Sequence, residues 1–160
     1  MIRFFNHSGV HTLYVTQDLN ASREEAWNFL SQPNNLSEIT PPEMGFTVTS
    51  PVQPPDMYAG QVITYKVSPF KGIRTHWVTE ITHVKEGVYF VDEQRFGPYR
   101  FWHHKHFIGE GGSGVRMTDE VTYKLPMGFI GRIANRLIIR KRLRKIFEYR
   151  QKVLSDRFPW

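Results

Sequence analysis

The pattern of apolar positions is most regular at the C-terminal end, between residues 129 and 158. In its second half, apolar residues recur three and four positions apart, which places them on one face of a helix. These residues are Ile139, Leu143, Ile146, Phe147, Val153 and Leu154. A second set comprises Ile130, Ile133, Ala134 and Leu137. The two sets point roughly 150° apart on a helix. The pattern therefore predicts either one long helix with two partners or two helices joined by a kink near Arg140.

The earlier part of the chain has the pattern of β-strands, because short runs of strand-forming residues are separated by turn-forming residues. Strands are expected at residues 11–19, 44–52, 61–69, 73–84, 87–96, 99–109 and 114–125. Gly-containing turns at 70–72, 85–87, 97–98 and 111–114 predict hairpins. After the first strand, Ser22 and Glu25 have the spacing of a capping box at a helix start. A second short helix is expected to end before Pro41.

This order of elements favours an α+β fold in which an antiparallel sheet curls around a helix. The space between a curled sheet and a helix is a natural cavity for a small molecule. With 160 residues and no long linker, the chain predicts a single domain over residues 1–160, with its core at about 11–158.

Several short stretches resemble those of a known protein family. They are residues 39–42 (ITPP), 77–81 (WVTEI), 90–94 (FVDEQ), 97–99 (GPY), 102–107 (WHHKHF), 117–119 (MTD) and 146–150 (IFEYR). Together with the order of elements, they resemble the START/Bet v1-like (SRPBCC) superfamily, in its bacterial polyketide cyclase/dehydrase-like or ligand-binding branch. The resemblance implies the helix-grip fold: a curved seven-stranded antiparallel sheet, two short helices and a long C-terminal helix enclosing a cavity. The superfamily includes carriers, hormone receptors, coenzyme Q-binding proteins and enzymes, so the fold does not select a function.

Two expected strands direct polar side chains towards the core. Lysine is rarely buried, so Lys105 in the strand at 99–109 is expected to face solvent. Alternation then turns Trp102, His104 and His106 inward. In the last strand, alternation turns Asp119 inward among apolar neighbours. A buried carboxylate needs a partner, and the neighbouring histidines are expected to supply one.

Arg150 interrupts the apolar face of the C-terminal helix. A cation at this position must reach solvent or pair inside the protein. One interpretation is a cationic floor for an acidic ligand head group. The commoner arrangement is a structural ion pair, with Asp119, Asp92 or Glu93 as the candidate partners.

These residues define one expected ligand-binding site. Its members are Trp102, His104, His106, Asp119, Tyr123 and Arg150, with Trp77, Tyr65 and Gln94 expected nearby. The sequence favours binding of a small hydrophobic or amphipathic molecule, such as a lipid, a quinone or a polyketide-like compound. An alternative is a cyclase or dehydratase that uses a His–Asp pair, from His104, His106 and Asp119, for proton transfer. The same pair could also be a polar network that only closes the core.

The histidine-rich strand raises the question of a metal. His104, His106 and Asp119 would be a plausible zinc or iron set. Histidines satisfied by carboxylates are commoner, however, so no metal is expected. No cofactor is expected either, because the glycines at 111–114 lie in a hairpin and not between a strand and a helix.

The net charge of +6 is concentrated in the C-terminal helix. Residues 132–157 include ten basic and two acidic side chains. A solvated helix face is the simplest explanation. The alternative is a membrane-surface interaction protein, whose basic helix makes transient contact with anionic lipid. No nucleic-acid partner is expected, because aromatic residues do not alternate with these charges. The oligomeric state is not predicted.

Cysteine is absent, which excludes disulfides, thiol catalysis and cysteine-based zinc sites. There is no run of 18 apolar residues and no signal-peptide pattern at the N-terminus. A cytoplasmic location is therefore expected.

Overall fold

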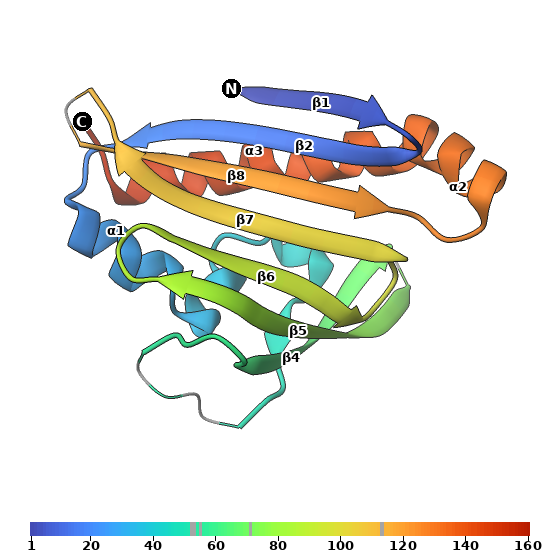
Figure 1. Cartoon of the computed structure of the whole chain (residues 1–160), viewed down its shortest axis with the longest axis horizontal. Helices are drawn as coiled ribbons and strands as arrows, with labels where there is room; N and C mark the ends of the chain where they lie inside the picture. The colour runs from blue at the N-terminus through green and yellow to red at the C-terminus, as the bar shows by residue number, and fades with distance from the viewer. Residues whose placement is uncertain (52–53, 55, 71, 113) are drawn as a thin grey trace.

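The computed structural model describes residues 1–51, 54, 56–70, 72–112 and 114–160. An antiparallel sheet curls around a long C-terminal helix (Figure 1). The strands are β1 (Ile2–His7), β2 (Val10–Leu19), β3 (Thr47–Val48), β4 (Val62–Phe70), β5 (Ile73–Lys85), β6 (Tyr89–Phe96), β7 (Phe101–Glu110) and β8 (Val115–Lys124). The helical elements are α1 (Arg23–Leu30), the 3-10 turns η1 (Pro33–Ser37) and η2 (Pro42–Met44), α2 (Gly128–Ala134), the π-helical turn η3 (Asn135–Ile139) and α3 (Arg140–Arg157).

Within the described residues, the sheet has eight strands in the order β1-β2-β8-β7-β6-β5-β4-β3, and every neighbouring pair is antiparallel. The predicted α+β fold is confirmed, but the predicted count of seven strands is wrong. The additional strand is β1, which forms a hairpin with β2 through Ser8 and Gly9. Both turn residues have positive φ, at 51° and 74°, as a tight two-residue hairpin requires.

The strand expected at 44–52 is much shorter than predicted. Residues 42–44 continue as a 3-10 turn, and Gly45 adopts a left-handed conformation that stops extended structure until Thr47. Position 52 of this expected strand, and positions 71 and 113 of two expected turns, lie outside the described residues.

The capping box at the start of α1 is confirmed. The Ser22 hydroxyl accepts a hydrogen bond from the Glu25 amide at 3.2 Å, and the Glu25 carboxylate accepts one from the Ser22 amide at 2.8 Å. The helix buries Ala26, Phe29 and Leu30 in an apolar cluster shared with the sheet and the end of α3. This packing places α1 at one end of the sheet (Figure 1).

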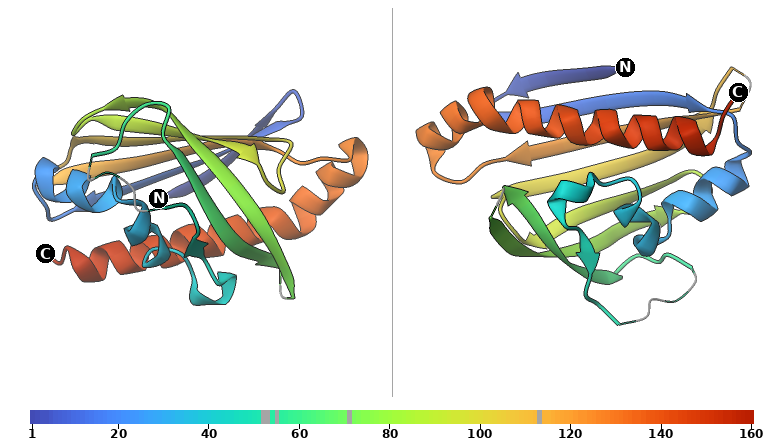
Figure 2. Two further views of the ribbon diagram at one scale, coloured as in Figure 1. Left: turned by 90° about the horizontal axis from the view of Figure 1, so that it is seen from below. Right: turned by 180° about the vertical axis from the view of Figure 1, so that it is seen from behind.

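The C-terminal helical segment lies across one face of the sheet and bends near α2 (Figure 2). The change of apolar phase occurs in η3, where a π-helical turn inserts an extra residue and rotates all later side chains. In α3, the buried positions are Leu143, Phe147, Arg150 and Leu154. None of the helices in the described part of the chain is both long and apolar enough to cross a membrane.

The apolar set of the first half is not buried, contrary to expectation. The exposed fractions of Ile130, Ile133 and Leu137 are 61%, 45% and 60%. Gly131 is a buried position of α2, where a Cβ atom would overlap the carbonyl of Pro126 in the turn before the helix.

Candidate functional site

A cavity of about 370 Å³ lies between the sheet, α3 and the short helices, within the usual range for small-molecule sites. Its wall is predominantly apolar and includes members of all three apolar core clusters. Representative wall residues are Phe29, Ile63, Tyr65, Trp77, Leu143 and Phe147. The cavity therefore lies against the apolar core.

A group of ionisable side chains forms the polar part of this wall. Asp92, His104, His106 and Arg150 line the cavity, and Asp119 lies directly behind them with no exposed surface. Strand register brings them together, because Asp92 is opposite His104 across β6–β7 and His106 is opposite Asp119 across β7–β8. Directly paired residues in an antiparallel sheet lie close enough for their side chains to meet.

Each imidazole contacts both carboxylates. From His104, Nε2 lies 3.1 Å from Asp119 Oδ1 and Nδ1 lies 3.3 Å from Asp92 Oδ2. From His106, Nδ1 lies 2.9 Å from Asp119 Oδ1 and Nε2 lies 2.7 Å from Asp92 Oδ2. The two rings lie against each other with their centroids 3.7 Å apart. The four residues thus form a closed ring of imidazole–carboxylate contacts.

Arg150 completes this group from the helix side. Its guanidinium nitrogen lies 3.5 Å from Asp119 Oδ1, and the side chain is only 6% exposed. The carbon of the guanidinium group also lies 5.8 Å from the centre of the Phe147 ring. Arg150 therefore makes the ion pair considered from the sequence, while still contributing to the cavity wall.

The pKa values reflect competition between burial and charge. Burial favours the neutral form of Asp119, but Arg150 and the two histidines outweigh it and hold its pKa well below the ordinary value. Burial likewise opposes the charge of Asp92, whose pKa is nevertheless lowered by His104, His106 and Arg150. Both carboxylates are therefore ionised at neutral pH.

The two histidines are shifted in opposite directions. Burial and the neighbouring His106 lower the pKa of His104, against the pull of both carboxylates. Burial also opposes the charge of His106, but the hydrogen bonds and charges of Asp119 and Asp92 outweigh it, and the pKa of His106 is raised. Two adjacent groups whose pKa values are shifted in opposite directions can accept and release a proton, as general acid–base chemistry requires.

Only some of the other predicted site residues line the cavity. Trp102, Trp77 and Tyr65 line the cavity, and the Trp102 and Trp77 rings meet edge to face at 5.2 Å. Tyr123 is fully buried behind the wall, where its hydroxyl donates a hydrogen bond to Asn135 at 2.8 Å. Gln94 does not line the cavity and instead bonds to the backbone of the loop before β7.

The sequence indicated Asp92 only as a candidate ion-pair partner of Arg150. The structure places Asp92 against both histidines. Its alternation with the buried Phe90 in β6 is a signal that it points inward. Tyr99, which lies 4.7 Å from Trp102 between ring centres, is another wall residue that the pattern did not identify.

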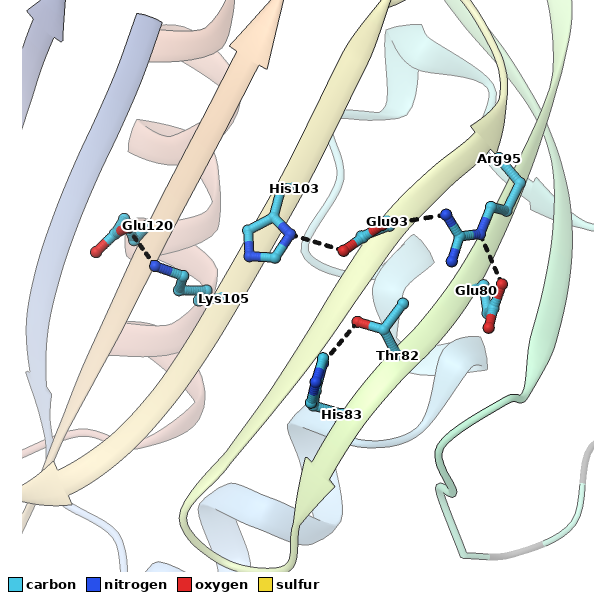
Figure 3. A network of polar contacts seen from close by, with 8 residues as sticks. All are labelled: Glu80, Thr82, His83, Glu93, Arg95, His103, Lys105 and Glu120. Atoms are coloured by element: carbon cyan, nitrogen blue, oxygen red, sulfur yellow. Dashed lines mark hydrogen bonds and ion pairs between the residues drawn. The ribbon is translucent and has the colours of Figure 1, made fainter. Parts of the chain in front are cut away.

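The opposite face of the same strands carries an ordinary surface network (Figure 3). His103 lies 2.9 Å from Glu93, and Lys105 donates a hydrogen bond to Glu120 at 2.8 Å. These side chains are between 24% and 35% exposed. The outer network also pairs histidine and basic side chains with carboxylates, so His103 and Glu120 serve as control positions for the buried group.

No protein-family model matches the sequence, and no curated protein is detectably similar to it. Solved structures do match. A protein from Thermus thermophilus superposes with a TM-score of 0.70 at 16% identity, over 92% of this chain and 96% of its own. A protein from Arthrobacter aurescens gives a TM-score of 0.70 at 12% identity, over 96% of this chain and 91% of its own.

A third match is Ara h 8.0201, with a TM-score of 0.60 at 13% identity over 92% of this chain and 99% of that protein. All three superpositions cover at least 92% of this chain. Ara h 8 is a Bet v1 allergen, and the chain accordingly has the Bet v1-like helix-grip fold that its sequence predicted.

Proposed function

We propose that this protein binds a small hydrophobic or amphipathic molecule in the cavity between the sheet and α3. The observation that carries the proposal is a predominantly apolar cavity of about 370 Å³ whose wall includes the buried group of Asp92, His104, His106 and Arg150. Bet v1-like folds generally bind hydrophobic ligands. Lipids, quinones and polyketide-like compounds all combine an apolar body with a few oxygen atoms, which is the chemistry that this wall suits.

The polar group supports a defined orientation of the ligand. The Nε–H of Arg150 is buried and has no hydrogen-bond partner among the described residues. A carbonyl or carboxylate oxygen of the ligand would satisfy it, and an unsatisfied buried donor costs about 1–3 kcal/mol. The oxygen-bearing end of the ligand then lies near Arg150 and His106, and its apolar body lies against the aromatic wall.

The test is a fluorescence titration with a naphthalene-sulfonate probe, which combines apolar aromatic rings with an anionic sulfonate. Trp102→Ala removes a large ring from the cavity wall, so probe affinity should fall roughly tenfold, as expected for the loss of an aromatic contact. Phe101→Ala is the matched control, because Phe101 is the preceding residue in β7 and is 44% exposed. Equal affinity of the two variants would contradict binding in this cavity.

A second candidate function is docking on an anionic lipid surface, and the observation that favours it is the exposed apolar surface of α2 and η3. Ile130 and Ile133 in α2, and Leu137 and Ile138 in η3, are 45–61% exposed. Exposed basic side chains lie in η3 and at the start of α3, at Arg136, Arg140, Lys141 and Arg144. An apolar stripe flanked by cations complements a bilayer with anionic headgroups. Because Gly131 and Ala134 line the cavity from the same helix, docking would bring lipid next to the site.

Vesicle co-sedimentation distinguishes this function. Wild-type protein should sediment with phosphatidylcholine vesicles containing phosphatidylglycerol, and added salt should weaken binding. Ile130→Asp combined with Ile133→Asp should abolish it. Val62→Asp is the control, since Val62 is 50% exposed on β4, away from α2. Equal sedimentation of both variants, or none for the wild type, would contradict lipid docking.

A further inference from the structure

We propose that Asp92, His104 and His106 form a binding site for one divalent transition-metal ion at the polar end of the cavity. One potential ligand atom from each residue lies within 4.8 Å of the other two. Metal–nitrogen and metal–oxygen bonds of about 2.0–2.2 Å require ligand atoms at this kind of spacing. Both imidazoles face Asp92 with one nitrogen, at 3.3 Å and 2.7 Å from the same carboxylate oxygen.

The contacts of the two rings direct one nitrogen of each towards Asp92. His104 Nε2 is hydrogen-bonded to Asp119 Oδ1 at 3.1 Å, and its Nδ1 lies 3.3 Å from Asp92 Oδ2. His106 Nε2 is hydrogen-bonded to the same Asp92 oxygen at 2.7 Å. A metal ion bound here would replace the proton between His106 Nε2 and Asp92 and would use His104 Nδ1, His106 Nε2 and Asp92 Oδ2 as ligands.

The residues behind the site form the supporting arrangement that metal-binding histidines need. His104 Nε2 and His106 Nδ1, the nitrogens turned away from Asp92, both lie within 3.1 Å of Asp119 Oδ1. Asp119 is hydrogen-bonded to His104 Nε2, and a carboxylate in this position fixes the tautomer of the ring and raises the basicity of its ligating nitrogen. Arg150 in turn neutralises Asp119. Asp119 thus supports the two histidines from behind, and the third ligand is Asp92.

The proposed site keeps coordination positions open. Two histidines and one carboxylate leave places for further ligands, and all three residues line the cavity. The nitrogen and oxygen ligands suit Zn²⁺ or Fe²⁺ better than Mg²⁺ or Ca²⁺, which prefer oxygen alone. An oxygen atom of a bound molecule can occupy an open position. The site does not depend on the proposed ligand function, because it can be tested with metal alone.

The first test is titration of chelator-treated protein with Co²⁺ and Zn²⁺. Wild-type protein should bind one Co²⁺ per chain with a visible absorption spectrum of four- or five-coordinate cobalt, and Zn²⁺ should displace it. Asp92→Asn and His106→Ala should weaken binding at least about 100-fold, and Asp119→Asn by about 10- to 100-fold, as changes behind a ligating histidine do. His103→Ala, on the outer face of the same strand, should leave binding unchanged. Unchanged affinity of Asp92→Asn would overturn the site.

A second test uses only wild-type protein, so it does not depend on the folding of variants. In ¹⁵N-histidine NMR spectra, Zn²⁺ should shift Nδ1 of His104 and Nε2 of His106, because these nitrogens face Asp92. His104 Nε2, which is hydrogen-bonded to Asp119, should remain protonated. Zinc signals confined to histidines outside the cavity, or no stoichiometric binding, would overturn the proposal. Either result would leave the apolar-probe titration, and hence the ligand proposal, unaffected.

Discussion

Replacing Asp119 by Asn should destabilise the protein substantially. The substitution keeps the shape of the side chain and removes one negative charge at a position with no solvent exposure. That charge lies within 3.5 Å of the two imidazoles and the Arg150 guanidinium. Without it, Arg150 is a buried cation that has lost its nearest carboxylate, and two imidazole nitrogens lose a charged acceptor.

The expected loss follows from these contacts. Removing one partner of a buried ion pair costs about 3–5 kcal/mol, since the other charge remains uncompensated. The Asn oxygen can still accept one hydrogen bond, which places the estimate near the lower end, at about 3 kcal/mol. For a chain of this size, 1 kcal/mol corresponds to roughly 2–4 °C in melting temperature, so a fall of about 6–12 °C is expected.

Urea denaturation and thermal melting, followed by circular dichroism with chelator present, measure this loss. Glu120→Gln is the matched control, because Glu120 is the next residue, faces outward and pairs with Lys105 at 30% exposure. An exposed pair contributes less than about 1 kcal/mol. Adding Arg150→Met to Asp119→Asn should recover part of the stability, since it removes the uncompensated cation. A melting temperature for Asp119→Asn within a degree or two of wild type would refute the reasoning.

Three further predictions address the wall, the helix cap and the π-turn. If the protein is a carrier, Trp102→Ala should weaken ligand uptake more than His104→Ala in a probe titration; a cyclase or dehydratase would instead lose turnover on His104→Ala with binding little changed. Ser22→Ala removes the α1 cap and should cost about 1 kcal/mol in urea denaturation, whereas an unchanged midpoint would contradict the cap's contribution. Tyr123→Phe leaves the buried Asn135 oxygen in the π-turn without its hydrogen-bond donor and should lower the free energy of unfolding by about 1–3 kcal/mol in the same assay. A free energy of unfolding equal to that of wild type would contradict a stabilising role for this hydrogen bond.

The fold could be predicted from the sequence because two patterns were clear: the strand runs between turns, and the spacing of apolar residues by three and four in the C-terminal helix. The strands from β4 to β8 appear close to their expected bounds, since Gly-containing turns separate them. The capping box at Ser22 also determined the start of α1. By contrast, β1 was missed, because residues 2–7 carry only a weak alternation and pair at a sheet edge, where one face stays exposed.

The candidate site was only partly predictable. Alternation within β7 and β8 was enough to turn His104, His106 and Asp119 inward. Which residues meet across strands depends on register, and the register between β6 and β7 places Asp92 opposite His104. No single-strand pattern contains that information.

The helix illustrates a different limit. The apolar pattern located the position where the apolar residues change from one helix face to another. The prediction also took every apolar side chain in the pattern to be buried. This assumption fails in α2, where the side chains of Ile130 and Ile133 are exposed.

Native mass spectrometry of the protein as purified from cells tests the central claim most directly. The account predicts one small apolar molecule per chain, extractable into organic solvent. It also predicts its loss from Ala134→Trp, which fills the cavity from α2 while the fold is retained. A wild-type protein that carries no such molecule, and takes up none after incubation with a lipid and quinone extract, would contradict ligand binding in this cavity.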